Sequence, residues 1–359
     1  MKRKPSIHDI ARQLNVSATS ISFVLNGKAK EKRVSEELEN KILNYVNKVG
    51  FSPNLIAKSL RTGKSNIIGM LVEDISDPFF SSITRNIETR AFQLGYKIFF
   101  SSTDNETEKA RSLIRILRER QVDGYIIAPA PGIEKDIQSL IDDNIPVVLF
   151  DRCFPKLPTI NVTIDNYQGA YNAVEHLIVN GYRNIGLVTL DSKQSQMTDR
   201  LKGYTQAMKA HHRDTTILQL PYHNRDAVTK IDDFLTVNNS LDAILFLTNY
   251  LAISGLEAIS ARQLSIPDDL AVVGFDDNTH FSLFSPAITA VAQPIEEISE
   301  EVIRQLMLLL NEGEIKAARK NIILPTRLII RRSSVKKTRT AAPKKKASAL
   351  PKAKAGIKK

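Results

Sequence analysis

The sequence has a single cysteine, Cys153, among its 359 residues. One cysteine excludes an internal disulfide and also a CxxC metal or redox site. Long hydrophobic runs are absent too, since no apolar stretch approaches the roughly 20 residues that a membrane-spanning helix needs. The charged segment 1–9 leads into a helical pattern and is unlike a signal peptide. We therefore expect a cytoplasmic protein without a membrane partner.

Acidic residues are missing from the end of the chain, so the charge is unevenly distributed. Residues 336–359 contain ten Lys or Arg and no Asp or Glu. Residues 1–64 contain 13 basic and five acidic residues, a net charge of +8, whereas residues 65–335 contain 27 basic and 34 acidic residues, a net charge of −7. Basic ends on an acidic middle predict terminal segments that meet a polyanion. Two solvated charge runs are the alternative.

The start of the chain is predicted to form three helices. Ser6, Ser17 and Ser35 each stand before an apolar pattern of helical period, as N-capping residues do. Asn15-Val16 separates the first two helices, which are short, and Gly50 suits the end of the third. Two short helices that are joined by a tight turn and braced by a third are typical of a helix-turn-helix unit.

The second helix would read DNA bases in the major groove, because that is its role in such a unit. Its outward residues are Ala18, Thr19, Ser20 and Ser22. Hydroxyl and methyl groups of these types can contact base edges. Asn26 and the basic loop 28–33 would contact phosphates. A helical module that contacts another protein is the alternative interpretation.

Changes of composition divide the rest of the chain into segments. Residues 51–64 contain Pro53 and a helical stretch too short to be stable alone, which predicts a hinge helix that forms only when it is held. Residues 65–335 alternate apolar strands with helical stretches, and the tail 336–359 has almost no apolar residue to bury and should be disordered. The predicted domains are a headpiece at 1–50, this hinge, an α/β core and the tail.

The core contains two series of near-continuous apolar strands, which are typical of parallel sheets covered on both faces. The first series is predicted at 67–72, 96–100, 124–127 and 146–150. The second is predicted at 184–188, 217–220, 242–247 and 270–275, with a last strand from Ile322 to Arg331. Two series indicate two α/β subdomains with a ligand cleft at the carboxyl ends of their strands.

The signatures of common enzyme classes are missing. Thr62-Gly63-Lys64-Ser65 is similar to the end of a phosphate-binding loop, but Lys58 stands where that loop needs a glycine. No GxGxxG follows a strand, the six histidines form no ligand-spaced cluster, and no set of nucleophile, base and orienting group stands out. We therefore predict no enzyme activity, no cofactor and no metal.

Ordered motifs of a known family are spread over residues 5–334. In the headpiece and hinge they are Asp9-Ile10-Ala11, residues 16–27, Val34-Ser35-Glu36, residues 50–54 and residues 57–63. In the core they are residues 75–80, residues 266–277 and residues 324–328. Together they resemble the LacI/GalR family of bacterial transcriptional regulators. The resemblance implies a homodimer on a palindromic operator, and a core similar to periplasmic sugar-binding proteins.

The resemblance also implies functional residues. Leu60 matches the hinge leucine that the family inserts into the minor groove. The residues that match the effector site are Phe79, Phe80, Asp165, Arg200, Asn249, Asp276 and Gln293. In the family the arginine and its polar partners hold a sugar or purine, and the two aromatic residues form a wall. Each has an alternative: Asp276 as a helix cap, Arg200 in a pair with acids near Asp199, and the phenylalanines as core.

Three features depart from the family pattern. Phe23 stands where many members have arginine, so the operator sequence cannot be copied from them. The loop 28–33 is longer than usual and adds charge. The carboxyl end lacks a leucine heptad, so nothing predicts a tetramer.

The sequence therefore predicts an effector-controlled, DNA-binding transcriptional repressor. Its fold class is an N-terminal all-α helix-turn-helix headpiece plus an α/β core of two subdomains with parallel sheets. Its partners would be double-stranded operator DNA, a sugar or purine-like effector and a second copy of the chain. A solute-binding receptor without a DNA role is the alternative, and the helix-turn-helix pattern argues against it.

Overall fold

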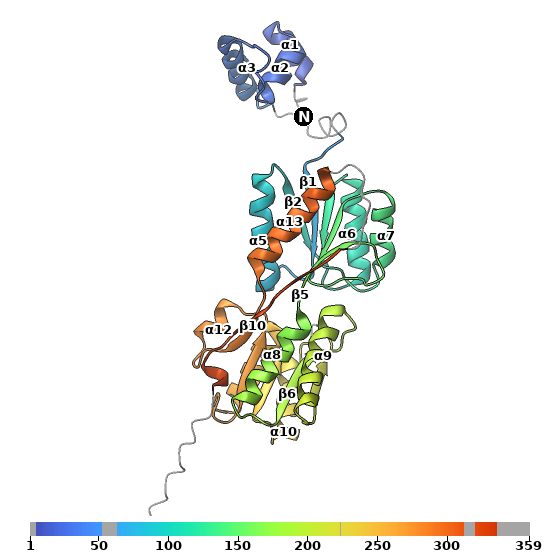
Figure 1. The fold of residues 1–359 in the computed structure, drawn as a ribbon. Coiled ribbons are helices and arrows are strands. Elements are labelled where there is room, and N and C mark those ends of the chain that lie inside the picture. The colour runs from blue at the N-terminus through green and yellow to red at the C-terminus, as the bar shows by residue number, and fades with distance from the viewer. Residues whose placement is uncertain (1–4, 52–62, 223, 312–319, 336–359) are drawn as a thin grey trace, which may run out of the picture.

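The chain folds into a helical headpiece and two stacked α/β subdomains (Figure 1). The computed structural model describes residues 5–51, 63–222, 224–311 and 320–335. Leu60, with most of the predicted hinge, and the predicted tail 336–359 lie outside these ranges. No helix within them is long and apolar enough to cross a membrane.

The headpiece contains the three predicted helices. They are α1 (Ile7–Leu14), α2 (Ala18–Leu25) and α3 (Glu36–Lys48). Ser6, Ser17 and Ser35 are their N-caps, and each hydroxyl accepts a hydrogen bond from the backbone N–H three residues later. Fully buried Ile21 of α2 and Ile42 of α3 belong to a small apolar core that joins the helices. The headpiece thus has a core of its own.

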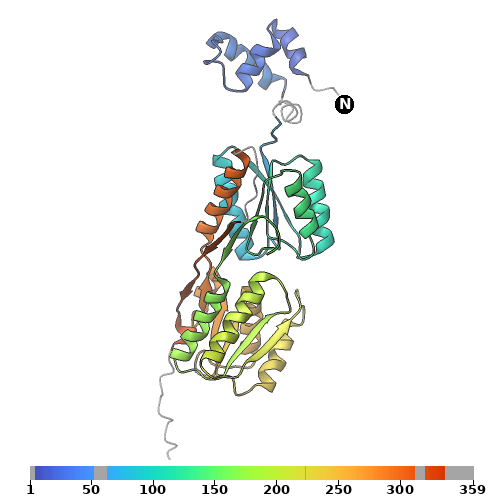
Figure 2. The ribbon, with the colours of Figure 1, turned by 45° about the vertical axis from the view of Figure 1, so that its right-hand side comes forward.

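The first subdomain is a parallel sheet of six strands in the order β11-β5-β4-β3-β1-β2. The strands are β1 (Ile67–Val72), β2 (Lys97–Ser102), β3 (Gly124–Ile127), β4 (Val147–Phe150), β5 (Ile160–Ile164) and β11 (Lys320–Leu324). The helices are α5 (Pro78–Gln93), α6 (Thr107–Glu119), α7 (Glu134–Asp142) and α13 (Ile295–Asn311). Helices α5 and α13 cover one face and α6 and α7 the other (Figure 2), which explains why the inner strands are apolar throughout.

The second subdomain has a sheet in the order β12-β10-β9-β8-β6-β7. The strands are β6 (Ile185–Leu190), β7 (Thr216–Leu220), β8 (Ala243–Phe246), β9 (Ala271–Phe275), β10 (Thr289–Ala292) and β12 (Arg327–Ile329). The helices are α8 (Asn166–Val179), α9 (Ser195–Ala210), α10 (Ala227–Val237), α11 (Asn249–Ala261) and α12 (Thr279–Leu283), with a 3-10 turn at Arg332–Ser334. Strand β12 runs antiparallel to β10, so this sheet is mixed rather than wholly parallel.

The predicted last strand, Ile322 to Arg331, is wrong as a single element. It is two strands in two sheets: β11 pairs with β5, and β12 pairs with β10. Pro325 separates them, and a proline supplies no N–H to a strand ladder. The strands β5 and β10 were also missing from the predicted series. Polar residues such as Asn161 and Thr163 interrupt the apolar run of β5.

The chain passes between the subdomains three times. It crosses after β5, after β10 and after β11, so each subdomain combines separate parts of the sequence. Strand β5, helix α13 and strand β11 thereby complete the first sheet and its cover. The carboxyl ends of β1 in one sheet and of β7, β8 and β9 in the other lead into a shared cavity. This edge is where ligands of such sheets bind.

Candidate functional site

The predicted base-contact residues lie on α2. Thr19 is exposed, whereas Ala18, Ser20 and Ser22 are half-buried. The Ser20 hydroxyl lies 2.8 Å from that of Ser17, and Asn26 Nδ2 donates to the Ser22 carbonyl oxygen at 2.6 Å. Ser20 and Asn26 therefore also stabilise the two ends of the helix, and Thr19 is the most accessible residue of the set.

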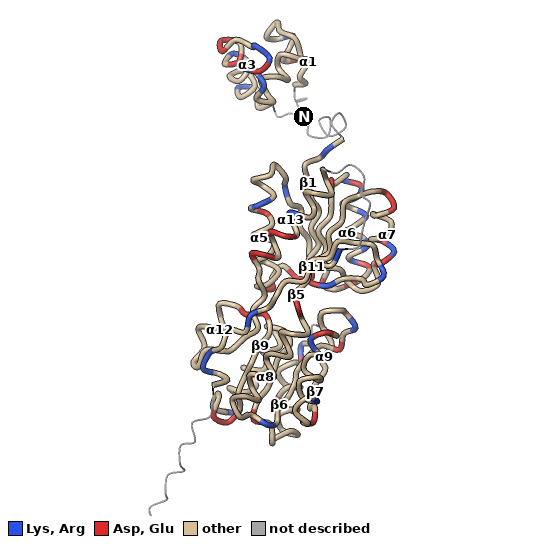
Figure 3. The backbone as a smooth tube through the Cα atoms, in the orientation of Figure 1, with Lys and Arg blue, Asp and Glu red and all other residues tan. Residues whose placement is uncertain are grey.

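The basic loop between α2 and α3 has a defined anchor. Ala29 is 2% exposed and belongs to the headpiece core, while Lys28, Lys30 and Arg33 around it are exposed. Helix α3 begins directly after the loop with an acidic first turn, and Figure 3 shows basic and acidic segments together in the headpiece. The loop thus holds these positive charges in solvent, where they can meet phosphates.

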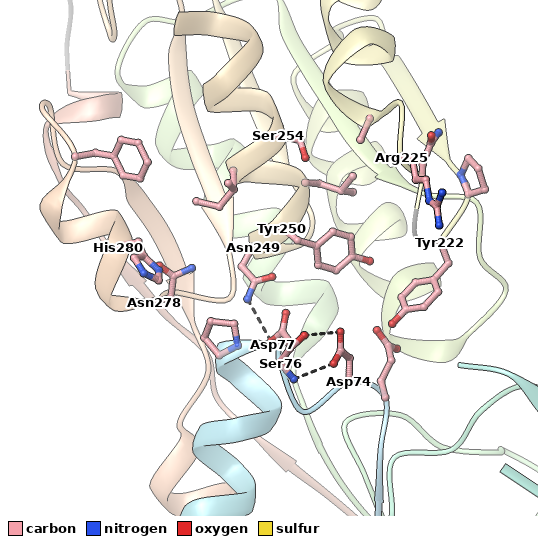
Figure 4. A pocket seen from close by; sticks show the side chains of 18 of the residues that line it. Asp74, Ser76, Asp77, Tyr222, Arg225, Asn249, Tyr250, Ser254, Asn278 and His280 are labelled. Carbon is pink, nitrogen blue, oxygen red and sulfur yellow. Dashed lines mark hydrogen bonds between the residues drawn. The ribbon is translucent and has the colours of Figure 1, made fainter. Parts of the chain in front are cut away.

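A cavity of about 830 Å³ lies between the two subdomains, within the size range of about 300–1,000 Å³ for small-molecule sites. Glu73 and Asp77 line it from the first subdomain, and Tyr222, Asn249 and Tyr250 from the second (Figure 4). Each lies within two residues of a strand end or at the start of a helix, so the sheet edges position them. A ligand here would touch both subdomains.

Asp77 is the N-cap of α5 and faces the second subdomain. Its carboxylate accepts a hydrogen bond from Phe79 N at 2.8 Å and one from Asn249 Nδ2 at 3.4 Å. Burial raises the pKa of Asp77 to about 6, and the negative charges of Asp276 and Glu73 add to the rise. The cavity therefore destabilises the negative charge that it contains.

Two tyrosines form an aromatic side of the cavity. The ring centroids of Tyr222 and Tyr250 lie 6.4 Å apart at 86°, an edge-on arrangement. Burial, reinforced by the nearby Glu73, raises the pKa of both phenols, so they stay neutral. Neutral phenols add no negative charge to the cavity, and their rings can contact the apolar faces of a ligand.

Arg200 holds a buried polar cluster behind the cavity. Its guanidinium donates to Asn166 Oδ1 at 2.8 Å, to the Leu247 carbonyl at 2.7 Å and to Asp276 Oδ2 at 3.1 Å. The same group lies 3.7 Å from the ring centroid of Phe275. Gln293 Nε2 donates to Asp276 Oδ1 at 2.6 Å. Burial raises the pKa of Asp276, and Arg200 and Gln293 oppose that rise.

Arg152 forms a second buried cluster, which the sequence analysis did not identify. It is 4% exposed, and it donates to Glu73 Oε2 at 2.5 Å and to Asp151 Oδ2 at 2.8 Å. Its Nη1 also donates to Asn105 Oδ1 at 3.3 Å. The available signal was the pair Asp151-Arg152 directly after the buried strand β4, at the edge where ligands bind.

Polar contacts cross the cleft between the subdomains. The side-chain amides of Asn105 and Gln194 exchange hydrogen bonds of 2.9 and 3.3 Å. Cys153 N donates to Ser195 Oγ at 3.2 Å. Within the described part of the chain, no group of three or more His, Cys, Asp and Glu could hold a metal ion.

The predicted effector residues fall into three groups. Asn249 lines the cavity, and Arg200, Asp276 and Gln293 form the cluster behind it. Phe79 and Phe80 are buried in the core, 8% and 5% exposed, with Phe80 edge-on to Phe150. Asp165 accepts a hydrogen bond from Gln168 N as the N-cap of α8. Their roles in effector binding stay predictions, as do those of the DNA-contact residues.

Comparisons with known proteins agree with this architecture. Residues 6–54 match the model of bacterial regulatory proteins of the lacI family, and residues 174–334 match the periplasmic binding protein-like domain. The HTH-type transcriptional regulator DegA of Bacillus subtilis is 31% identical over 339 residues, which cover 92% of this chain and 98% of that protein. The chain belongs to the LacI family. It is therefore a DNA-binding transcriptional regulator with an effector-binding core and not an enzyme, as predicted.

Further proteins are similar to this chain in sequence or in fold. The ribose operon repressor of Halalkalibacterium halodurans is 29% identical and covers 92% of this chain and 97% of its own length. The structure of a putative ribose operon repressor from Burkholderia thailandensis is 26% identical, covers 74% of this chain and 99% of that chain, and gives a TM-score of 0.66. The structure of the lac repressor dimer bound to its operator is 21% identical, covers 93% of this chain and 100% of that chain, and gives a TM-score of 0.81. These matches confirm the predicted headpiece and two-subdomain core.

Proposed function

We propose that this LacI-family chain is a cytoplasmic repressor whose affinity for operator DNA is controlled by a sugar bound in the cavity between its subdomains. The observation that carries the proposal is the shared lining, in which Asp77 of one subdomain meets Asn249 of the other. Carboxylate, amide and phenol groups around aromatic rings suit a polyhydroxyl ligand. Ribose operon repressors and PurR repressors both occur among the relatives at similar identity, so the proposal of a sugar rests on the lining of the cavity.

Ligand binding would act on DNA through the arrangement of the subdomains. A ligand that touches both sides of the cleft favours the closed arrangement over the open one. The Asn105–Gln194 amide pair and the Asp77–Asn249 contact are groups that such a movement makes or breaks. The first subdomain adjoins the hinge, so its displacement changes how the headpieces meet the operator.

On DNA, α2 would enter the major groove with Ala18, Thr19, Ser20 and Ser22 toward the bases. Asn26 and the loop 28–33 would contact phosphates. Leu60 of the hinge would enter the minor groove, where an inserted apolar side chain bends DNA at a cost of a few kcal/mol that the added contacts offset. The basic tail 336–359 would add contacts to the backbone that read no sequence.

The test of this function joins a DNA selection to a ligand screen. The full chain is expected to enrich one palindromic sequence from a library of random duplexes. In a thermal-shift screen of sugars and purines, a ligand that binds only the native state raises the melting temperature. Enrichment of no sequence would contradict the regulator, and a purine that stabilises the protein while no sugar does would contradict the sugar effector.

We further propose that the chain is a homodimer joined through the β2 edge of the first sheet. This edge strand exposes Phe99 and Phe100, the exposed Ile116 of α6 lines the same surface hollow, and Phe92 and Leu94 shortly before the strand in the chain are also exposed. An apolar patch of this kind on an unpaired strand edge is typical of a protein interface.

A charge placed in that patch should separate the subunits. We expect Phe99→Glu to convert the dimer into a monomer in sedimentation velocity runs, because dimerisation would bury the new carboxylate. Val237→Glu is the matched control, since Val237 is an exposed apolar residue at the end of α10, far along the chain from β2. A Phe99→Glu variant that sediments as the native dimer would exclude this interface.

A further inference from the structure

The cavity contains carboxylates that no cation neutralises. Glu73 is paired with Arg152, but Asp74 and Asp77 make no ion pair with any residue in the described ranges. Asp74 accepts hydrogen bonds from the N–H and hydroxyl of Ser76, both at 2.8 Å, and Asp77 accepts its bonds from Phe79 N and Asn249. All these donors are neutral. Two negative charges therefore face the cavity without a counter-charge.

The two basic side chains of the lining lie away from these carboxylates. Figure 4 places Arg225 beyond Tyr222 and His280 beside Asn278, while Asp74 and Asp77 lie below the Tyr250 ring. The negative part of the cavity thus borders the two tyrosine rings. Aromatic faces attract cations, and the attraction adds to that of a carboxylate.

From these observations we infer that the effector carries a protonated amine in addition to hydroxyl groups, as an amino sugar does. An ammonium group offers three donors and no acceptor, which fits a site rich in acceptors. It would neutralise the carboxylates and stabilise the ionised form of Asp77. This inference rests on the proposed function, because it specifies the chemistry of the sugar that this cavity takes.

Matched pairs of sugars test the amine directly. Isothermal titration calorimetry on the full chain compares D-glucosamine with D-glucose and N-acetyl-D-glucosamine, and D-galactosamine with D-galactose and N-acetyl-D-galactosamine. In at least one set, the amine is expected to bind about 10- to 100-fold more tightly than both neutral compounds, as a charge-assisted hydrogen bond implies.

Substitutions then locate the amine in the cavity. Asp77→Asn keeps an oxygen for the helix cap and removes the charge, so it should weaken binding of the amine by about tenfold or more and weaken binding of the neutral sugar by a smaller factor. Asp74→Asn should act in the same direction. Asp136→Asn in the first turn of α7, which also removes one carboxylate of the first subdomain, is the control and should bind as the native chain does. Thermal unfolding checks that all three variants are folded.

The outcomes separate this inference from the proposed function. Two results overturn the inference of an amine and leave a sugar effector in place. One is a neutral sugar that binds as tightly as the matching amino sugar. The other is an amino sugar whose affinity neither Asp77→Asn nor Asp74→Asn changes. Binding by none of the six compounds also overturns it. The sugar effector itself fails only if the wider thermal-shift screen finds no stabilising sugar.

Discussion

Replacing Arg200 with alanine is expected to lower the free energy of unfolding of the core by about 3–5 kcal/mol and to abolish the effector response. Arg200 is 2% exposed, and its guanidinium neutralises Asp276 and bonds Asn166. Its removal leaves a buried carboxylate without a counter-charge, and breaking one side of a buried pair has this cost. Urea unfolding followed by circular dichroism measures the first effect, and calorimetry with the identified effector measures the second.

Arg262→Ala is the matched control in the same subdomain. Arg262 pairs with Asp232 at 2.5 Å, but both side chains are partly exposed, 27% and 42%. Because water screens such a pair, its loss should cost about 1 kcal/mol or less. An equal decrease in the free energy of unfolding in the two variants would show that the Arg200 cluster stabilises the core no more than an exposed ion pair does. Native effector affinity in Arg200→Ala would remove Arg200 from the effector site.

Replacing Ile42 with alanine is expected to abolish operator binding while the core still binds effector. Ile42 of α3 is fully buried among the few residues of the headpiece core. Truncation of a buried isoleucine costs about 2–5 kcal/mol. A core this small rarely supplies more than about 3–5 kcal/mol in total. The headpiece should therefore unfold, whereas the core, with its separate packing, should not.

Fluorescence anisotropy on the selected duplex measures this loss, and thermal unfolding follows the core. Leu43→Ala changes the neighbouring residue of α3, which is 37% exposed, and should bind DNA almost as the native chain does. Operator binding of native strength by Ile42→Ala would mean that DNA recognition does not depend on the folded headpiece.

Local patterns were sufficient to predict elements in which capping residues and the spacing of apolar residues indicate the same structure. Serine caps located the three headpiece helices, and apolar runs located β1, β3 and β9 to within one residue. Local patterns were insufficient where the bounds of a strand are set by the strand that it pairs with. The segment from Ile322 to Arg331 is continuous in hydropathy, but its halves pair with β5 and β10 in different sheets. Pro325 marks the break between the halves, but a single sequence does not show which strand each half pairs with.

The candidate site was predictable where it follows strand ends in the chain. Asp276 directly follows β9, and Asn249 begins the helix after β8. Both lie at the edge of the sheet that faces the cleft. The Arg152 cluster joins Glu73 and Asn105, which are 79 and 47 residues away in sequence, so only the folded sheet brings them together. Phe79 and Phe80, for which an aromatic wall and the core were both open, are buried in the core at the first turn of α5, and their role toward an effector stays a prediction.

The most direct test of the central claim is the affinity of the full chain for its selected duplex with and without effector. Anisotropy titrations at one salt concentration, with saturating effector in one series, give the two dissociation constants. The account predicts that they differ by about 5- to 150-fold, the usual range of coupling between two sites. It also predicts that Asp276→Ala binds the duplex as the native chain does and loses the difference. Equal dissociation constants for the native chain with and without bound effector would contradict the control of DNA binding through the cavity.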